Sequence, residues 1–197
     1  MKDTKEHILK TAFLLFLQKN YKAVTLKNII AATGLSNGAF YHYFETKEQL
    51  FKEVVEHYLF SITGQVFKSY PKDSLWNFMQ FALNDMEKIY DTVKNYANQA
   101  ESVNFIYFMF EALRYFPEVR EETIRLLHLE LATWVGMIEI AKANGEIKSD
   151  LPNEVLARFF TYMPDGNSMT FAVDNDFKPL KNRIRDLWEG LYNTLKA

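Results

Sequence analysis

Side chains that form hydrogen bonds are concentrated between residues 25 and 44, in the sequence TLKNIIAATGLSNGAFYHYF. Thr25 and Ser36 each stand at the start of a segment with helical character, and Asn37, Tyr41 and His42 follow Ser36 closely. Hydroxyl, amide and imidazole groups of this kind bind phosphate oxygens and the edges of bases. The pattern therefore indicates recognition of a nucleic acid rather than catalysis.

The rest of the chain offers no familiar catalytic or metal-binding constellation. Cysteine is absent, and the four histidines, at positions 7, 42, 57 and 128, are scattered. No H-x-x-x-H pair, glycine-rich phosphate loop or serine elbow is present. The pair Glu121-Glu122 is typical of a solvated helix surface. We therefore expect no metal and no cofactor, and an enzyme is the alternative that a turnover screen on a metabolite panel would reveal.

Two short helices joined by a turn are predicted for residues 25–44. Thr25 caps the first helix, Thr33-Gly34 interrupts it, and Ser36 caps the second helix, which runs to about residue 44. This is a helix-turn-helix, in which the second helix enters the major groove of DNA. Packing between the two helices is assigned to Ile29, Ile30, Leu35 and Phe40, which leaves Ser36, Asn37, Gly38, Ala39, Tyr41 and His42 facing outward.

The chemistry of these residues suggests individual roles. Thr25, at a helix N-terminus, offers its hydroxyl and backbone N–H groups to a phosphate, and Lys27 reaches a phosphate or a guanine edge. Asn37 is suited to forming two hydrogen bonds with adenine. The methyl group of Ala39 is suited to contact with a thymine methyl. Gly38 is small enough to let the helix sit deep in the groove. The alternative is that the motif serves packing alone, and for Tyr43 and Phe44 we expect a place in the core.

The run T-x-x-x-I-x-x-x-x-G-L-S-x-G-A-F-Y-H-Y-F-x-T-K-E-x-L, which begins at Thr25, resembles the signature of the TetR family of bacterial regulators. The resemblance covers residues 3–58 and implies operator DNA as the partner. It also implies that Tyr41 and His42 clamp phosphates and that Lys47 anchors the DNA backbone. Two departures stand out: the recognition helix contains no Lys or Arg, and Asn20 stands where a Gly is usual.

Helical periodicity continues through most of the chain, so we predict an all-α, nine-helix, TetR-like fold. Pro164 falls inside the eighth helix and is expected to kink or break it. The predicted division is a DNA-binding head at 1–46 and a helical ligand-binding and dimerisation domain at 47–197. The nine helices are predicted at about 3–20, 25–33, 36–44, 46–67, 74–96, 99–115, 117–143, 152–173 and 177–195.

The family resemblance implies that the C-terminal region binds a small effector, which its aromatic and methionine content suggests is apolar or aromatic. The alternative is a solid core, as in an architectural or adaptor protein that binds no ligand. Phe and Trp side chains filling the interior would favour that alternative. The residues assigned to the pocket are Tyr58, Ile62, Phe105, Met109, Leu127, Trp134, Phe160 and Met163.

The last two helices are predicted to pair with their copies in a homodimer, through a stripe at helical spacing formed by Leu187, Trp188, Leu191 and Leu195. Packing within one subunit is the alternative. A two-fold dimer matches a pseudo-palindromic operator. Repression, with release by the effector, is the expected mode of action, although an activator would have the same sequence features.

Composition is compatible with a cytoplasmic DNA-binding protein. Residues 1–58 carry a formal net charge of +2 and residues 59–197 a net charge of −4, an asymmetry that lets the N-terminal part face phosphates. No charged-then-apolar leader is seen after Met1, and no apolar stretch approaches the ~18 residues of a membrane span. We therefore expect no membrane partner.

Overall fold

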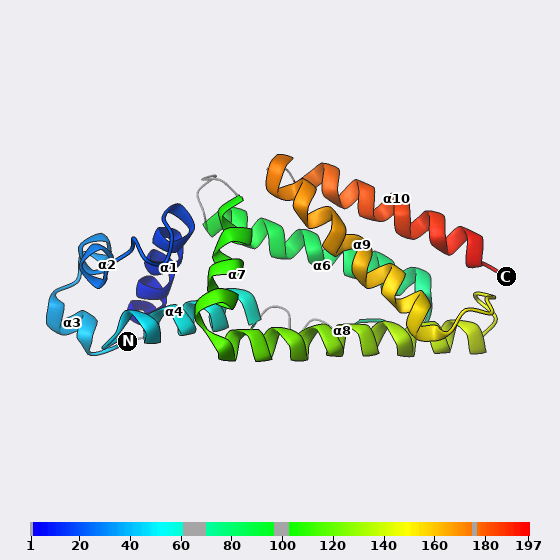
Figure 1. Ribbon diagram of the computed structural model, residues 1–197, viewed down its shortest axis with the longest axis horizontal. Coiled ribbons are helices and arrows are strands. Elements are labelled where there is room, and N and C mark those ends of the chain that lie inside the picture. Colours follow the sequence, from blue (N-terminus) through cyan, green and yellow to red (C-terminus); the bar gives the residue numbers. More distant parts are fainter. Residues whose placement is uncertain (1, 61–69, 97–102, 175–176) are drawn as a thin grey trace. The chain divides into compact units, whose positions relative to one another are not determined.

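The computed structural model describes residues 2–60, 70–96, 103–174 and 177–197. Within these residues the fold is all-α, with nine helices when α4 and the π-type turn that continues it, η1, are taken together (Figure 1). An isolated β-bridge joins Ile147 to Lys196. None of the described helices is both long and apolar enough to cross a membrane. The helices are α1 (Lys2–Gln18), α2 (Leu26–Thr33), α3 (Asn37–Tyr41), α4 (Lys47–Val55), η1 (Glu56–Phe60), α6 (Leu75–Tyr96), α7 (Val103–Tyr115), α8 (Pro117–Ala143), α9 (Asn153–Asp174) and α10 (Phe177–Leu195).

Side-chain caps set the starts of the N-terminal helices. The Thr25 hydroxyl accepts a hydrogen bond from the N–H of Asn28, and the Asn28 side chain accepts one from the N–H of Thr25, which completes a capping box. Ser36 caps α3 by accepting from the N–H of Ala39. Thr46 caps α4 by accepting from the N–H of Gln49. The predicted starts of these three helices are therefore confirmed.

Contacts divide the chain into two compact units. The first comprises Met1–Ile62 and Thr92–Glu122, and the second comprises Thr63–Asp91 and Thr123–Ala197. The helix-turn-helix lies within the first unit. Helices α6 and α8 each contribute residues to both units.

The core of the first unit is rich in aromatic rings. Phe13, on α1, stacks on Tyr58 with ring centroids 4.2 Å apart and meets Phe108 of α7 edge-on at 5.5 Å. Phe51, on α4, stacks on Phe116 at 4.9 Å. All five rings are buried, and burial of large apolar side chains is the main stabilising term in folding. Helices α1, α4 and α7 are thereby held in one body.

Three aromatic side chains fill the core of the second unit. Trp134 of α8 stacks on Phe160 of α9 with centroids 4.9 Å apart and planes 5° from parallel, and it meets Trp188 of α10 at 5.0 Å. All three are at most 2% exposed. The rings therefore leave no room for a ligand at this point of the unit.

Of the two outcomes predicted for Pro164, a kink or a break, the break does not occur, since α9 runs without interruption from Asn153 to Asp174. Proline lacks the N–H group that would bond the carbonyl four residues earlier, which is that of Phe160. The indole Nε1–H of Trp188 donates to this same carbonyl at 3.1 Å. A donor from α10 thus replaces the missing helical bond, which removes one reason for the helix to end.

The remaining differences from the predicted helices are small. The predicted recognition helix runs to residue 44, whereas α3 ends at Tyr41, and the N–H groups of Tyr43 and Phe44 both bond the carbonyl of Phe40 in the turn that follows. Helices α8 and α10 have the predicted bounds. Parts of the predicted helices 46–67 and 99–115 lie outside the described residues.

Candidate nucleic-acid interface

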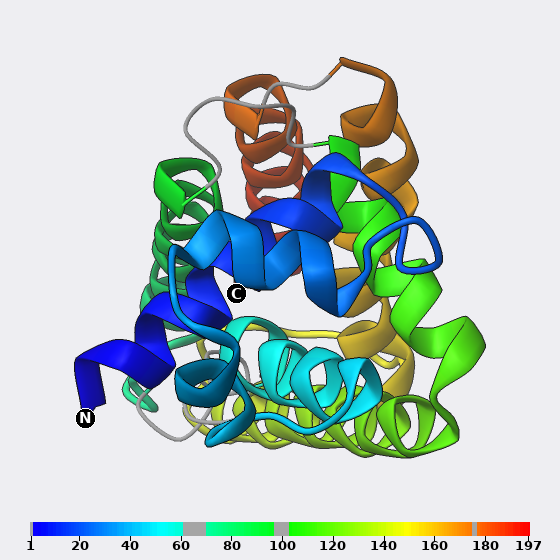
Figure 2. The ribbon, with the colours of Figure 1, turned by 90° about the vertical axis from the view of Figure 1, so that its left-hand side faces the viewer.

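Helices α2 and α3 form a helix-turn-helix. Helix α2 ends at Gly34, whose φ of 69° is left-handed and is readily adopted by glycine. Ile29 of α2 and Phe40 of α3 are fully buried, so each helix turns one side inward. His7 of α1 hydrogen-bonds the carbonyl of Thr33 through Nε2 at 3.0 Å and ties the end of α2 to α1. Figure 2 turns α2 and α3 toward the viewer.

The outward face of α3 carries the side chains that the sequence assigned to DNA. Phe44 is fully buried, as expected for a core residue, whereas Tyr43 is only half-buried. Tyr41 is 48% exposed, and His42 is also exposed although its ring meets Tyr43 at 5.1 Å. The structure thus brings six of the predicted residues together on one exposed segment: Ser36, Asn37, Gly38, Ala39, Tyr41 and His42.

Thr25 and Lys27 lie at the start of α2, and both are exposed. The N–H and the hydroxyl of Thr25 both donate to Oδ1 of Asn28, at 3.0 and 2.7 Å. The donors that the sequence reasoning assigned to a phosphate are therefore engaged within the capping box. The N–H groups of Leu26 and Lys27, at the first two positions of the helix, have no helical acceptor by geometry and point outward along the axis. They are better placed to meet a phosphate than Thr25 is.

Lys47 is half-buried, and its ammonium group contacts the protein itself. Nζ donates to the carbonyls of Tyr21 and Val24, both at 2.9 Å, and lies 4.3 Å from the centre of the Tyr21 ring. These bonds fix the loop between α1 and α2 to the start of α4. An ammonium group has three N–H donors, so one is left for a phosphate.

Tyr21 is the centre of a network that the sequence reasoning missed. Its N–H donates to Oε2 of Glu111 on α7 at 2.7 Å, and its hydroxyl donates to Oε1 of Glu48 at 3.1 Å. Burial, reinforced by the charge of the Glu48 carboxylate and its hydrogen bond, raises the pKa of Tyr21 to about 12. Hydrogen bonding to its own backbone N–H, and to the Tyr21 hydroxyl, lowers the pKa of Glu48. The hydroxyl is therefore a neutral donor to a carboxylate throughout the neutral pH range.

Comparison with known proteins agrees with this geometry. The sequence profile described as "Bacterial regulatory proteins, tetR family" matches residues 8–54, which include α2, α3 and most of α4. Residues 8–54 therefore form a DNA-binding domain of the TetR family. The chain is accordingly a DNA-binding transcriptional regulator of a non-enzymatic family.

Relatives of this TetR-family regulator match along most of its length. It is 26% identical over 172 residues to the uncharacterised HTH-type regulator YfiR of Bacillus subtilis. The aligned residues cover 84% of this chain and 82% of YfiR. It is 24% identical over 160 residues to the repressor KstR2 of Mycolicibacterium smegmatis, covering 79% and 73% of the two chains. The structure of a SmeT–triclosan complex is similar in fold, with a TM-score of 0.72, 15% identity and coverage of 99% and 92%.

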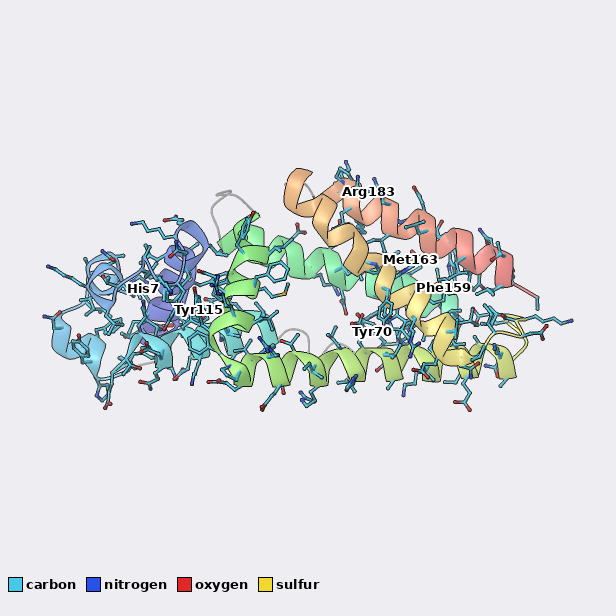
Figure 3. The ribbon with its side chains drawn as sticks, viewed as in Figure 1. His7, Tyr70, Tyr115, Phe159, Met163 and Arg183 are labelled. Carbon is cyan, nitrogen blue, oxygen red and sulfur yellow. The ribbon has the colours of Figure 1, made fainter. Side chains whose placement is uncertain are left out.

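In the second unit of the regulator, the described residues predicted to line an effector pocket differ in their burial. Trp134 and Phe160 belong to the closed aromatic stack, whereas Leu127 is 50% exposed on α8. Met163 is half-buried on α9 (Figure 3). Of those in the first unit, Tyr58 is buried against Phe13 and Met109 is half-buried; Ile62 and the side chain of Phe105 lie outside the described residues.

A pocket of about 320 Å³ lies elsewhere in the second unit, along one side of α8. Its described lining is mostly apolar, with Lys72 as the charged member and Thr133 as the polar one. The Thr133 hydroxyl donates to the carbonyl of Leu129 at 2.7 Å. Among the described residues, His, Asp and Glu do not gather into a group that would hold a metal ion. The described lining consists of Lys72, Phe78, Leu129, Ala132, Thr133, Gly136, Met137 and Ile140.

The stripe on α10 predicted to form the dimer contact is divided by the fold. Trp188 and Leu195 are buried within their own chain, whereas Leu187 is 45% exposed and Leu191 is half-buried. The spacing of the stripe is helical. Because α10 has apolar residues on more than one side, the sequence does not determine which side faces the protein interior. Exposed apolar side chains on α9 were not assigned: Phe159, labelled in Figure 3, and Tyr162.

Proposed function

We propose that this regulator is a repressor that binds a pseudo-palindromic operator as a homodimer and is released by a small, largely apolar effector. The observation that carries the DNA part is the exposed segment 36–42, which comprises α3 and its two caps and presents six residues with suitable chemistry, while Ile29 and Phe40 are buried. Repression is supported by the similarity to KstR2, which is a repressor. Action in the bacterial cytoplasm, at the nucleoid, follows from DNA as the partner.

The apolar pocket beside α8 supports the effector. Its volume of about 320 Å³ falls at the lower end of the range for small-molecule sites, and its lining is largely apolar with few polar groups. The structure of SmeT, which is similar in fold, is that of a complex with triclosan. Helix α8 begins in the first unit and lines this pocket in the second, so we propose it as the link between effector and head.

The homodimer is proposed to form through α9 and α10. Apolar side chains are exposed on both helices, at Phe159 and Tyr162 of α9 and at Leu187 of α10. Gly190, one helical turn from Leu187, is exposed, and a Cβ added there would meet no described atom within 4 Å. A glycine with free space around it permits close approach of a second helix. The division into a head at 1–46 and an effector and dimer domain at 47–197 completes the proposal.

A regulator without a small-molecule effector is the second candidate. The closed stack of Trp134, Phe160 and Trp188 favours it, since these rings fill the part of the second unit where the sequence placed ligand contacts. The pocket beside α8 favours the effector. The two candidates differ in whether any small molecule changes operator affinity.

The test begins with selection of bound duplexes from a random pool, followed by footprinting. A library of small apolar compounds is then screened by the rise in melting temperature, since a ligand that binds only the folded state raises it. We expect a compound that raises the melting temperature to weaken operator binding at least tenfold, which corresponds to about 1.4 kcal/mol.

The variant Gly136→Leu places a side chain into the pocket, because a Cβ at Gly136 meets no described atom within 4 Å. We expect it to retain operator binding and lose the response to the compound. Thr123→Leu, on the same helix outside the described lining, is the matched control. Failure to select any duplex would contradict DNA binding. If no compound that raises the melting temperature changes the operator affinity, the candidate without an effector is favoured.

A further inference from the structure

Gly38, the second residue of α3, occupies a position where the protein itself does not need a glycine. Its φ is not in the left-handed region, which within the described chain is recorded for Gly34 and Gly145. A Cβ added at Gly38 would meet no described atom within 4 Å. Alanine is more favourable than glycine inside a helix. The free space is therefore available to a molecule outside the chain, because no side chain covers the backbone of α3 at Gly38.

The side chains beside Gly38 are those that recognise A·T base pairs. Asn37 is exposed, and its amide can donate one hydrogen bond to N7 of adenine while its carbonyl oxygen accepts one from N6. Ala39 is also exposed and presents only a methyl group, which suits the C5 methyl of thymine. Tyr41 adds an exposed ring one turn further along α3.

Cations that read guanine are missing from this face. Arg and Lys make the commonest specific contacts to guanine, and residues 28–46 contain neither. Lys47 is the next cation, but its ammonium group is bound to the carbonyls of Tyr21 and Val24. Lys27, exposed at the start of α2, is the cation left to reach a base edge from the helix-turn-helix segment 25–47.

We propose that the base pairs beneath α3 in each operator half-site are A·T pairs, with a thymine methyl against Ala39, and that guanine is read only by Lys27. Gly38 allows the close approach that these short side chains require, because neither an amide nor a methyl group reaches far from the helix. This inference rests on the proposed binding of operator DNA through α3 and adds the class of bases that it recognises.

The first experiment is selection with the full chain from a random duplex pool, repeated with Lys27→Ala. We expect A·T pairs at the centre of each half-site with both proteins, and any preferred G·C pair to lose its preference in the variant. A G·C pair at the centre that persists in Lys27→Ala would overturn the proposal while leaving operator binding intact. Failure of the wild-type chain to select any sequence would instead count against DNA binding itself.

The second experiment removes single methyl groups from the DNA. Each preferred thymine is replaced by uracil, which lacks only the C5 methyl. We expect one replacement to weaken binding of the wild-type chain about fourfold, the effect of one buried methyl group. The same replacement should have no effect on Ala39→Gly. If uracil weakens binding of both proteins equally, or of neither, the assigned contact is wrong.

Gly38→Ala separates contact with DNA from folding. Because the Cβ enters free space, we expect the melting temperature to stay the same or rise. Binding to the selected duplex should weaken at least tenfold, since the methyl group occupies the approach to the base edges. Ala32→Gly on α2, exposed but outside the recognition helix, makes the reverse change as a control for helix stability. If Gly38→Ala binds the selected duplex as tightly as the wild type, or melts at a lower temperature, the proposed close approach of α3 to the base edges is wrong.

Discussion

The ammonium group of Lys47 can donate hydrogen bonds to oxygen atoms of the protein or of the DNA. In the structure, two of its three N–H donors are used within the protein. Nζ bonds the carbonyls of Tyr21 and Val24, which lie more than twenty residues earlier in the chain. The family resemblance implied a contact with the DNA backbone. Both roles are compatible, because the lysine that shapes the loop between α1 and α2 also has one donor for a phosphate.

Lys47→Ala is expected to reduce both stability and DNA affinity. Hydrogen bonds to charged groups contribute about 1.5–3 kcal/mol, so the free energy of unfolding in urea should fall by about that amount. Binding to all duplexes should weaken together. The slope of log affinity against log salt should become shallower by about one unit, because the variant neutralises one phosphate fewer.

Lys27→Ala is the matched control for the stability part of this prediction, since Lys27 is exposed at the start of α2. We expect its free energy of unfolding to remain within about 0.5 kcal/mol of the wild-type value. A salt slope that Lys47→Ala leaves unchanged would confine Lys47 to a structural role.

Local residue chemistry was predictable where the partners are close in sequence. The caps at Thr25, Ser36 and Thr46 bond residues three positions ahead, so residue type and local sequence were enough to predict them. The bond from the N–H of Tyr21 to Glu111 joins residues 90 positions apart. No periodic pattern encodes such a pair, because the docking of α7 depends on the packing of the whole unit.

Helix α9 shows how one element depends on another. Pro164 removes the donor for the carbonyl of Phe160, and the indole of Trp188 on α10 supplies one at 3.1 Å. Sequence rules treat proline as a helix breaker because they consider one helix at a time. The same bond explains why Trp188 points inward instead of joining the exposed face of α10, where the sequence had placed it for a dimer contact.

Trp188→Phe is expected to destabilise the protein through this carbonyl. The ring remains, but a buried acceptor loses its donor, which costs about 1–3 kcal/mol. Pro164→Ala restores a backbone N–H four residues after Phe160, so the double variant should recover part of this loss. A double-mutant cycle in urea measures the recovery as the coupling energy. Additive effects of the two substitutions would mean that the indole does not act as the replacement donor.

Helix bounds were largely predictable because the apolar period, the caps and the prolines agree. Pro117 at the start of α8 and Asn144-Gly145 after its end gave the bounds Pro117–Ala143. The end of α3 was not predictable in the same way. The chain leaves helical geometry after Tyr41 while Phe40 and Phe44 are both buried, so packing determines where the turn begins.

For the whole molecule, the sequence predicted the family and the all-α fold but not the inward side of every helix. Trp134, Phe160 and Trp188 were assigned to a ligand pocket or a dimer contact, and they form one buried stack instead. Apolar composition alone does not distinguish a side chain that fills a core from one that lines a cavity. The pocket beside α8 is lined in part by small residues, Ala132, Thr133 and Gly136, which hydrophobic patterns do not single out.

The proposed homodimer leads to a prediction with a closely matched control. Leu187 on α10 and Leu151, in the loop before α9, are both 45% exposed. Burial of a leucine contributes about 1.5–3 kcal/mol, and a two-fold interface contains each residue twice. We therefore expect Leu187→Glu to weaken dimerisation more than 100-fold in sedimentation equilibrium.

Leu151→Glu introduces the same charge at the same exposure outside the proposed contact, so its dimerisation constant should be unchanged. Both variants should keep the helical circular dichroism of the wild type, since each glutamate enters a solvated position. Because a pseudo-palindromic operator is bound by two heads at once, Leu187→Glu should also bind a full operator no more tightly than a half-site. Equal effects of the two substitutions would place the dimer contact on a surface other than α9 and α10.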